Sequence, residues 1–276
     1  MTKERLEQLI AQYNAYVKSF ADENGILPAM MQLKVEHTHR VVEDARRIMA
    51  GEGWGLEDVE LGEVAALLHD TARYSQFKTY KTFKDSDSFD HAARAVKIIH
   101  EQGWLDELST SERHAILTAV AVHNKREIPA AVRGKSLQMA WLVRDADKLD
   151  ILHLLEKAVN DGSLERNPEI AWGLQMKGIP DARLMEAVEA GRTVSYDWIH
   201  CFADFVLIQV GWLNGGLQYG SSVRLVQERR VLEFREELLS RLTDNHPGVT
   251  RCCQAAREWL ESGVLKSQGP SLRFTS

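Results

Sequence analysis

Cysteine is scarce in this chain, and long apolar runs are missing altogether. The three cysteines, Cys201, Cys252 and Cys253, form no CxxC pair, and neighbouring cysteines rarely bond to each other. A disulfide framework or a thiolate zinc site is therefore not expected. No apolar run approaches the roughly 18 residues that a membrane-spanning helix needs. The N-terminus leads into an amphipathic stretch instead of a signal core, so we expect a cytoplasmic protein without membrane association.

An excess of positive charge is also missing. The chain has 34 Lys and Arg against 40 Asp and Glu, a formal net charge of −6 at pH 7. Nucleic acid is recognised mainly through basic side chains, so it is not the expected partner. With 276 residues, of which 44% are hydrophobic, the chain can bury a sizeable core.

The period-2 alternation of β-strands is absent, and helical periodicity dominates. Apolar residues recur at i, i+3 and i+4 through most of the chain. This pattern predicts an all-α fold, most simply a single domain over residues 1–276. The expected helices cover about residues 6–20, 31–50, 56–74, 90–103, 110–124, 135–160, 182–190, 195–214, 221–242 and 248–263.

Three segments lack this periodicity. Residues 76–90 are polar and basic and are predicted to form a loop. Residues 160–181 are irregular and rich in glycine and proline, which indicates a lid, an insertion or a boundary. The helices predicted after it, over 182–263, form a C-terminal helical extension. The polar tail 268–276 is expected to be disordered.

Histidines and aspartates lie on the apolar faces of five predicted helices. An unpaired charge or imidazole in an apolar interior costs several kcal/mol unless a partner neutralises it. One or two divalent cations would neutralise the whole set together. The set therefore predicts a metal site inside the helical bundle, and its members are His37, His69, Asp70, His91, His123 and Asp147.

Helical phase indicates which of these side chains can meet. His37 shares the apolar face of its helix, whereas His39 falls on the solvated face and is expected at the surface or behind the ligands. His69 and Asp70 are neighbours and would point about 100 degrees apart on a helix. Both can therefore reach one site only if that site lies against the helix end.

The remaining three members differ in how strongly each one points to a metal. His91 opens its helix and His123 closes its own, and either one alone could be an ordinary core histidine. Asp147 lies within the most apolar helix, on the face of Val143 and Ile151. A carboxylate at that position is strongly disfavoured without a cation or an arginine partner.

The order of these residues resembles the HD-domain superfamily of metal-dependent phosphohydrolases. The family pattern is a His, a His-Asp doublet and a distal Asp in an Ala-Asp context. It reads here as His37, then the doublet His69-Asp70 in LLHDTAR, then Asp147 in DADKLD. The resemblance covers about residues 30–155. It implies an HD-like helical bundle with these four residues as ligands of a first metal.

His91 and His123 stand where binuclear family members place further ligands. The resemblance therefore implies one or two divalent ions, and the ligand types do not distinguish Mn, Fe, Co, Ni, Mg and Zn. Two positions differ from the family pattern. Ala72 stands where members often have Gly, and Asn124 where some binuclear branches have a second His. Mononuclear and binuclear sites both stay open.

Positive charges follow the doublet closely. Arg73, Lys78, Lys81 and Lys84 place four cations within 12 residues of an otherwise acidic chain. Such groups bind phosphate through charge-assisted hydrogen bonds, although a solvated basic loop would look the same. We expect Arg73, which resembles a family position that meets phosphate, to act in catalysis. Arg73, Lys78, Lys81 and Lys148 are the expected substrate-binding residues.

These features predict hydrolysis of a nucleotide or another small phosphoester. A metal-activated water would be the nucleophile, and Asp70 would be a bridging ligand that orients it. Two alternatives stay open, a di-iron oxygenase on the same helical scaffold and a non-catalytic nucleotide-binding regulatory protein. The oligomeric state is open too, with a homodimer among the alternatives.

Overall fold

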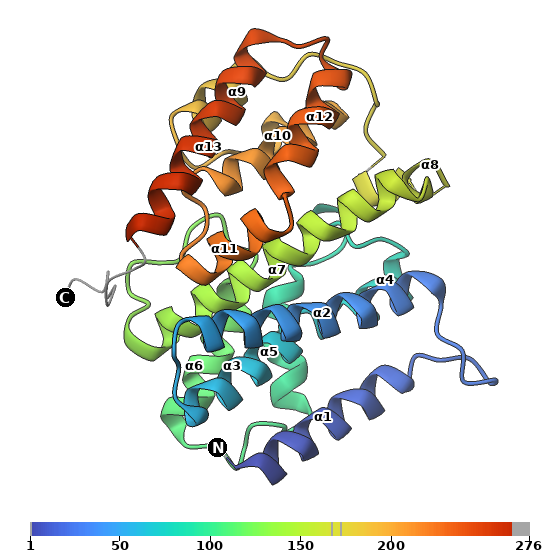
Figure 1. The fold of residues 1–276 in the computed structure, drawn as a ribbon. Coiled ribbons are helices and arrows are strands. Elements are labelled where there is room, and N and C mark those ends of the chain that lie inside the picture. Colours follow the sequence, from blue (N-terminus) through green and yellow to red (C-terminus); the bar gives the residue numbers. More distant parts are fainter. Residues whose placement is uncertain (1, 167, 172, 267–276) are drawn as a thin grey trace. The chain divides into compact units, whose positions relative to one another are not determined.

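Helices connected by short segments make up the described part of the chain (Figure 1). The computed structural model describes residues 2–166, 168–171 and 173–266. Within these ranges the one β pairing is an isolated bridge between Gln175 and Cys201, so the predicted all-α fold is confirmed. None of the helices in these ranges combines the length and apolarity needed to cross a bilayer.

The chain divides into two compact units, the first ending at Asp147 and the second beginning at Lys148. This boundary falls inside the long helix α7 (Gly134–Asn160). The single domain expected from the sequence stays a prediction. The other helices of the first unit are α1 (Lys3–Lys18), α2 (Ala29–Gly51), α3 (Leu56–Leu68), α4 (Arg73–Tyr80), α5 (His91–Glu101) and α6 (Thr110–Val122).

Helix α3 forms the centre of the first unit. Its last eight residues, 61–68, are all buried, and the one charged residue among them, Glu63, pairs with Arg46 on α2. A Cβ atom on Gly62 would lie 2.4 Å from the sulfur of Met49 and 2.7 Å from a methyl carbon of Leu142. Glycine at this position therefore lets α2 and α7 approach α3 closely. The same central helix carries the His-Asp doublet at its C-terminal end.

Helix α4 corrects two predictions. The helix expected over 56–74 ends at Leu68, and the expected loop 76–90 is helical over its first five residues. Tyr74 and Gln76 are both fully buried, and the Tyr74 hydroxyl lies 2.9 Å from the hydroxyl of Tyr13 on α1. Contacts with distant residues therefore support this short helix, and local periodicity does not reveal them. The short 3₁₀ helix η1 (Asp85–Asp87) follows it.

The second unit corrects two further helix bounds. The helix expected over 195–214 begins only at Phe202, and the helix expected over 221–242 is broken at Arg230, whose φ of 53° lies in the left-handed region. The predicted tail 268–276 lies outside the described residues. Short helices α8 (Ser163–Arg166) and η2 (Pro168–Ala171) occur in the segment expected to be irregular. The others are α9 (Ala182–Glu189), η3 (Tyr196–Trp198), α10 (Phe202–Leu213), α11 (Gly220–Glu228), α12 (Val231–Leu242) and α13 (Pro247–Lys266).

Candidate metal centre

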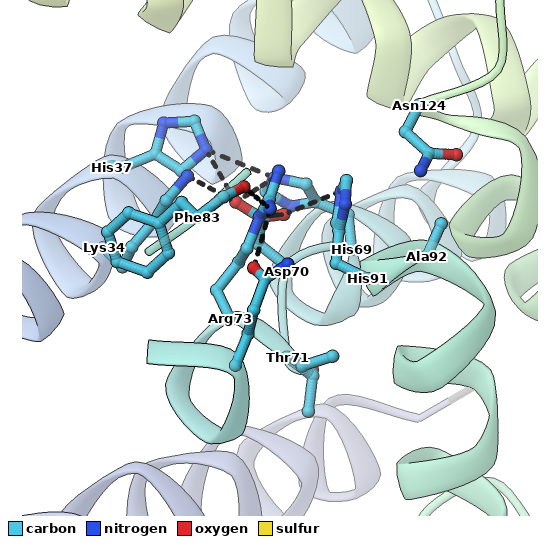
Figure 2. Close-up of polar contacts among 12 residues, drawn as sticks. Lys34, His37, His69, Asp70, Thr71, Arg73, Phe83, His91, Ala92 and Asn124 are labelled. Atoms are coloured by element: carbon cyan, nitrogen blue, oxygen red, sulfur yellow. Dashed lines mark hydrogen bonds and ion pairs between the residues drawn. The ribbon is translucent and has the colours of Figure 1, made fainter. Parts of the chain in front are cut away.

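All six predicted ligands meet in one cluster of the first unit, and most of them stand at helix ends. Figure 2 shows four of them, His37, His69, Asp70 and His91. His69 directly follows α3, and Asp70 lies in the turn that leads to α4. His91 is the first residue of α5, and His123 directly follows α6. His91 and His123 therefore open and close their helices as predicted, and the doublet meets the condition that its site lies against a helix end. His37 and Asp147 lie within α2 and α7.

One half of the cluster surrounds the Oδ2 atom of Asp70. This oxygen lies 3.4 Å from Nε2 of His37 and 3.6 Å from Nε2 of His69. The two Nε2 atoms are 3.3 Å apart. Oδ1 of Asp147 closes the group, at 3.3 Å from Nε2 of His37 and 3.8 Å from Nε2 of His69. Two imidazole nitrogens and two carboxylate oxygens thus face a common point.

The other half surrounds the second oxygen of the same carboxylate. Oδ1 of Asp70 lies 3.4 Å from Nε2 of His91 and 3.8 Å from Nε2 of His123. The two histidine Nε2 atoms are 2.9 Å apart. Each oxygen of Asp70 therefore belongs to a different group of donors, which is the arrangement of a bridging carboxylate.

Hydrogen bonds on the outer side of the rings determine where the imidazole protons lie. Nδ1 of His69 is 2.7 Å from the carbonyl oxygen of Ala66, and Nδ1 of His123 is 2.7 Å from that of Val120. Nδ1 of His91 is 2.6 Å from a carboxylate oxygen of Asp85. Carbonyl and carboxylate oxygens only accept, so Nδ1 must donate in each case. A neutral ring of this kind keeps a lone pair on Nε2, as metal-binding histidines do.

A cation would account for the close contact between His91 and His123. Two neutral rings that both donate through Nδ1 present lone pairs to each other, and lone pairs cannot form a hydrogen bond. Burial lowers the pKa of His91 to about 4, and nearby Arg73 adds to that effect. Protonation of His91 therefore does not resolve the contact at neutral pH. A metal ion held by both Nε2 atoms would resolve it.

The donor set fits such ions in spacing and in charge. Two atoms that each lie about 2.1 Å from one ion, at right angles, are about 3 Å apart, close to the spacings above. Asp147 is a partly buried carboxylate with 19% of its side chain exposed; desolvation opposes its ionisation, but His37 and His69 hold its pKa below the usual range. The carboxyl-terminal ends of α3 and α6 also favour positive charge. The residues present can therefore hold one or two divalent cations.

Two basic side chains accompany the bridging carboxylate. Nζ of Lys34 lies 2.8 Å from Oδ2 of Asp70, and Nε of Arg73 lies 3.3 Å from Oδ1. Burial would raise the pKa of Asp70, but Lys34, His69 and Arg73 together hold it well below its usual value. Lys34 was missed in the sequence, although it precedes His37 by three residues and so shares its helix face.

The predicted substrate-binding residues lie in different surroundings. Arg73 reaches Asp70 as expected. The ammonium groups of Lys78 and Lys81 lie 5.6 and 5.9 Å from the ring centres of two phenylalanines, Phe20 and Phe77. The ammonium group of Lys148 donates to the carbonyl of Gly216 within the second unit. Of these four residues, the structure brings Arg73 against the His and Asp cluster, and the roles of the three lysines stay predictions.

Asp85 is the second residue that was missed in the sequence. It lies in the segment predicted as a loop, where no periodicity assigns a direction to any side chain. Its carboxylate accepts hydrogen bonds from His91, Arg73 and Gln76. Asn124, at one of the two positions that differ from the family pattern, lies 3.3 Å from the same carboxylate. Apart from Asn124, these partners lie within 12 residues of Asp85, but no periodic pattern in the sequence identifies them.

Comparison with protein families agrees with this geometry. Residues 35–152 match the family described as the HD domain. This segment is an HD domain. It contains all six residues of the cluster and agrees closely with the extent of about 30–155 inferred from the motifs. No curated protein and no solved structure gave a significant match to the chain. HD domains bind divalent metals, and the His and Asp groups of this one are suited to that role.

Proposed function

We propose that this chain is a metal-dependent phosphohydrolase acting on a nucleotide or another small phosphoester. Its centre would hold two divalent ions, with Asp70 contributing to both ligand groups. The observation that carries this proposal is the division of the Asp70 carboxylate, because Oδ2 faces His37 and His69 while Oδ1 faces His91 and His123. The HD-domain match supports the broader class of metal-dependent phosphohydrolases.

The protonation states of the cluster suit this chemistry. Divalent ions, when bound, polarise phosphoryl oxygens and lower the pKa of water from about 15.7 towards about 7, which supplies a nucleophile. Asp70 stays ionised at neutral pH because Lys34, His69 and Arg73 keep its pKa low against the effect of burial. Burial keeps His69 neutral by lowering its pKa to about 4. Asp70 and His69 therefore need not lose a proton before they bind a cation.

Lys34 and Arg73 supply the positive charge that a phosphoester needs. Lys34 is only partly buried, with 20% of its side chain exposed, and it contacts the oxygen of Asp70 that faces the first ligand group. In this proposal its ammonium group donates to a phosphate oxygen of the substrate. Arg73 adds charge beside Asp70, and contacts with Gln76 and Asp85 hold its guanidinium group in place. Charge-assisted bonds of this kind are the stronger hydrogen bonds in proteins.

The direct test joins metal analysis to a substrate screen. The purified protein is assayed for bound metals by elemental analysis and then screened against phosphomonoesters and phosphodiesters. Each assay is run with chelator and again after the metal is restored. His37→Ala should abolish phosphate release, whereas His39→Ala, an exposed histidine on the same helix, should leave it unchanged. Absence of metal-dependent phosphate release across the whole screen would overturn the proposal.

The same experiment separates the two alternatives. Mixed imidazole and carboxylate donors also suit a pair of iron ions. Two bound irons with oxygen consumption and no phosphate release would indicate a di-iron oxygenase. Tight nucleotide binding without any product would indicate a regulatory module. The two cations beside Asp70 favour an anionic substrate, and for that reason hydrolysis of a phosphoester is the function we propose.

A further inference from the structure

The Nδ1 atom of His91 has a different kind of hydrogen-bond acceptor from those of His69 and His123. His69 and His123 follow helices, and each lies against the carbonyl oxygen three residues earlier. The acceptor in each case is a carbonyl oxygen in the last turn of the preceding helix. His91 is the first residue of α5, so no helical turn precedes it. Its Nδ1 reaches instead the carboxylate of Asp85, at 2.6 Å, and its orientation depends on that side chain.

Asp85 is itself held by several donors. Nη1 of Arg73 and Nε2 of Gln76 both lie 3.0 Å from its Oδ1 atom. Its Oδ2 atom accepts from the backbone N–H of His91 and from the amide of Asn124, both at 3.3 Å. Gln76 is fully buried, so the carboxylate rests on a fixed part of α4. These contacts fix the position of Asp85, and Asp85 in turn fixes the ring of His91.

The two partners of Asp85 that contact Asp70, His91 and Arg73, both contact its Oδ1 atom. His91 faces Oδ1 of Asp70, and Arg73 contacts the same oxygen, at 3.4 and 3.3 Å. This is the half completed by His123. The other half takes its ligands from α2, from the end of α3 and from α7, and His123 also lies within reach of its His69 and Asp147, whereas His91 does not group with them. A substitution of Asp85 should therefore weaken metal binding at the position beside His91 more than at the other position.

We propose that Asp85 is a positioning residue that controls the second metal position, the one bounded by His91, His123 and Oδ1 of Asp70. A carboxylate that accepts from Nδ1 fixes the ring and strengthens Nε2 as a donor, and losing such a partner typically weakens metal binding about 10- to 100-fold. The segment between α4 and α5 thereby decides whether the centre holds one ion or two. This inference rests on the binuclear centre of the proposed function but not on hydrolysis.

Metal titration tests this directly with Mn²⁺ as the probe. The full-length protein is freed of metal by chelation, and binding is followed by calorimetry and elemental analysis. Wild type should bind two ions per chain. Asp85→Asn should bind the first ion with unchanged affinity and the second about 10- to 100-fold more weakly. Asp87→Asn changes an exposed carboxylate on the same 3₁₀ turn and should behave as wild type.

Further variants separate positioning from folding. Combining Asp85→Asn with His91→Ala should weaken the second ion no more than His91→Ala alone, because both act through one ring. Thermal unfolding checks that each variant is folded. If Asp85→Asn fails to fold, Asp85→Ser, which leaves room for water, must show the same selective loss.

Three results would overturn the proposal. They are equal weakening of both ions by Asp85→Asn, unchanged binding of both ions, and a wild-type protein that binds a single ion. Phosphate release is not a readout in this experiment. A protein that binds two ions but hydrolyses no phosphoester would therefore refute the proposed function and leave this inference standing.

Discussion

Lys34 directs its ammonium group to the same oxygen of Asp70 that faces His37 and His69, at a distance of 2.8 Å from Nζ to Oδ2. This lysine thus places positive charge where the first ligand group converges. A cation entering that group competes with Lys34 for Asp70. Once displaced, the ammonium group is available to an anion on the substrate, as our proposed function requires.

Lys34→Met should separate these two roles. Removing the competing charge should tighten binding of the first metal ion, because Asp70 loses its alternative partner. The KM for a phosphoester should rise about 10- to 100-fold, the loss expected for one hydrogen bond to a charged group. Calorimetry and steady-state kinetics measure the two effects. Lys97→Met, which changes an exposed lysine on α5, is the matched control. An unchanged KM in Lys34→Met would remove Lys34 from substrate binding.

Asp70→Asn should weaken both metal positions, since each of its oxygens belongs to a different ligand group. His37→Ala should weaken mainly one position and His91→Ala mainly the other. Loss of the centre should lower kcat by about 10³-fold or more, because metal ions supply several kcal/mol of charge stabilisation. Elemental analysis gives the stoichiometry of each variant. If Asp70→Asn lost only one of two ions, Asp70 would not be the common ligand.

The metal-free protein should lose stability on mild acidification. Burial lowers the pKa of both His69 and His91 to about 4 in the folded state, against about 6.5 when unfolded. Between these values the unfolded state binds more protons, so the free energy of unfolding rises with pH. Each imidazole should therefore remove roughly 3 kcal/mol as the pH falls from about 6.5 to about 4. Urea unfolding of the chelated protein across this range measures the loss, and a flat profile would contradict it.

Arg144 should stabilise the end of α6, where His123 lies. This buried arginine donates to the carbonyl oxygens of Val122 and His123, just where α6 ends. Arg144→Met would leave these acceptors without their charged donor and should cost about 1–3 kcal/mol in the free energy of unfolding. Urea denaturation measures this cost. Arg133→Met, at an exposed position nearby in sequence, should change stability by less than about 0.5 kcal/mol.

Much of the site could be predicted because it depends on local order. The position of His37 on the apolar face of its helix follows from helical spacing, as does the exposure of His39 on the opposite side. The placement of His69 and Asp70 at a helix end follows from the angle between neighbours on a helix. Lys34 could have been found by the same reasoning, because it stands one turn before His37.

Asp85 could not be found in that way. Its segment has no repeating pattern, and its importance comes from a contact with His91 across the turn before α5. The helix at residues 73–80 was missed for a related reason, since it depends on burial of Tyr74 against Tyr13 on α1. Both features involve residues that meet only after the helices have packed.

The sequence by itself determined the all-α fold, the six side chains of the His and Asp cluster and their order along the chain. Hydrophobic periodicity is a local property, and it places residues on one face of a helix whatever lies opposite. The tertiary structure alone decided that the two oxygens of Asp70 serve different ligand groups, and that Lys34 and Asp85 stand beside them. Such contacts depend on packing between helices, because they join side chains that no local pattern relates.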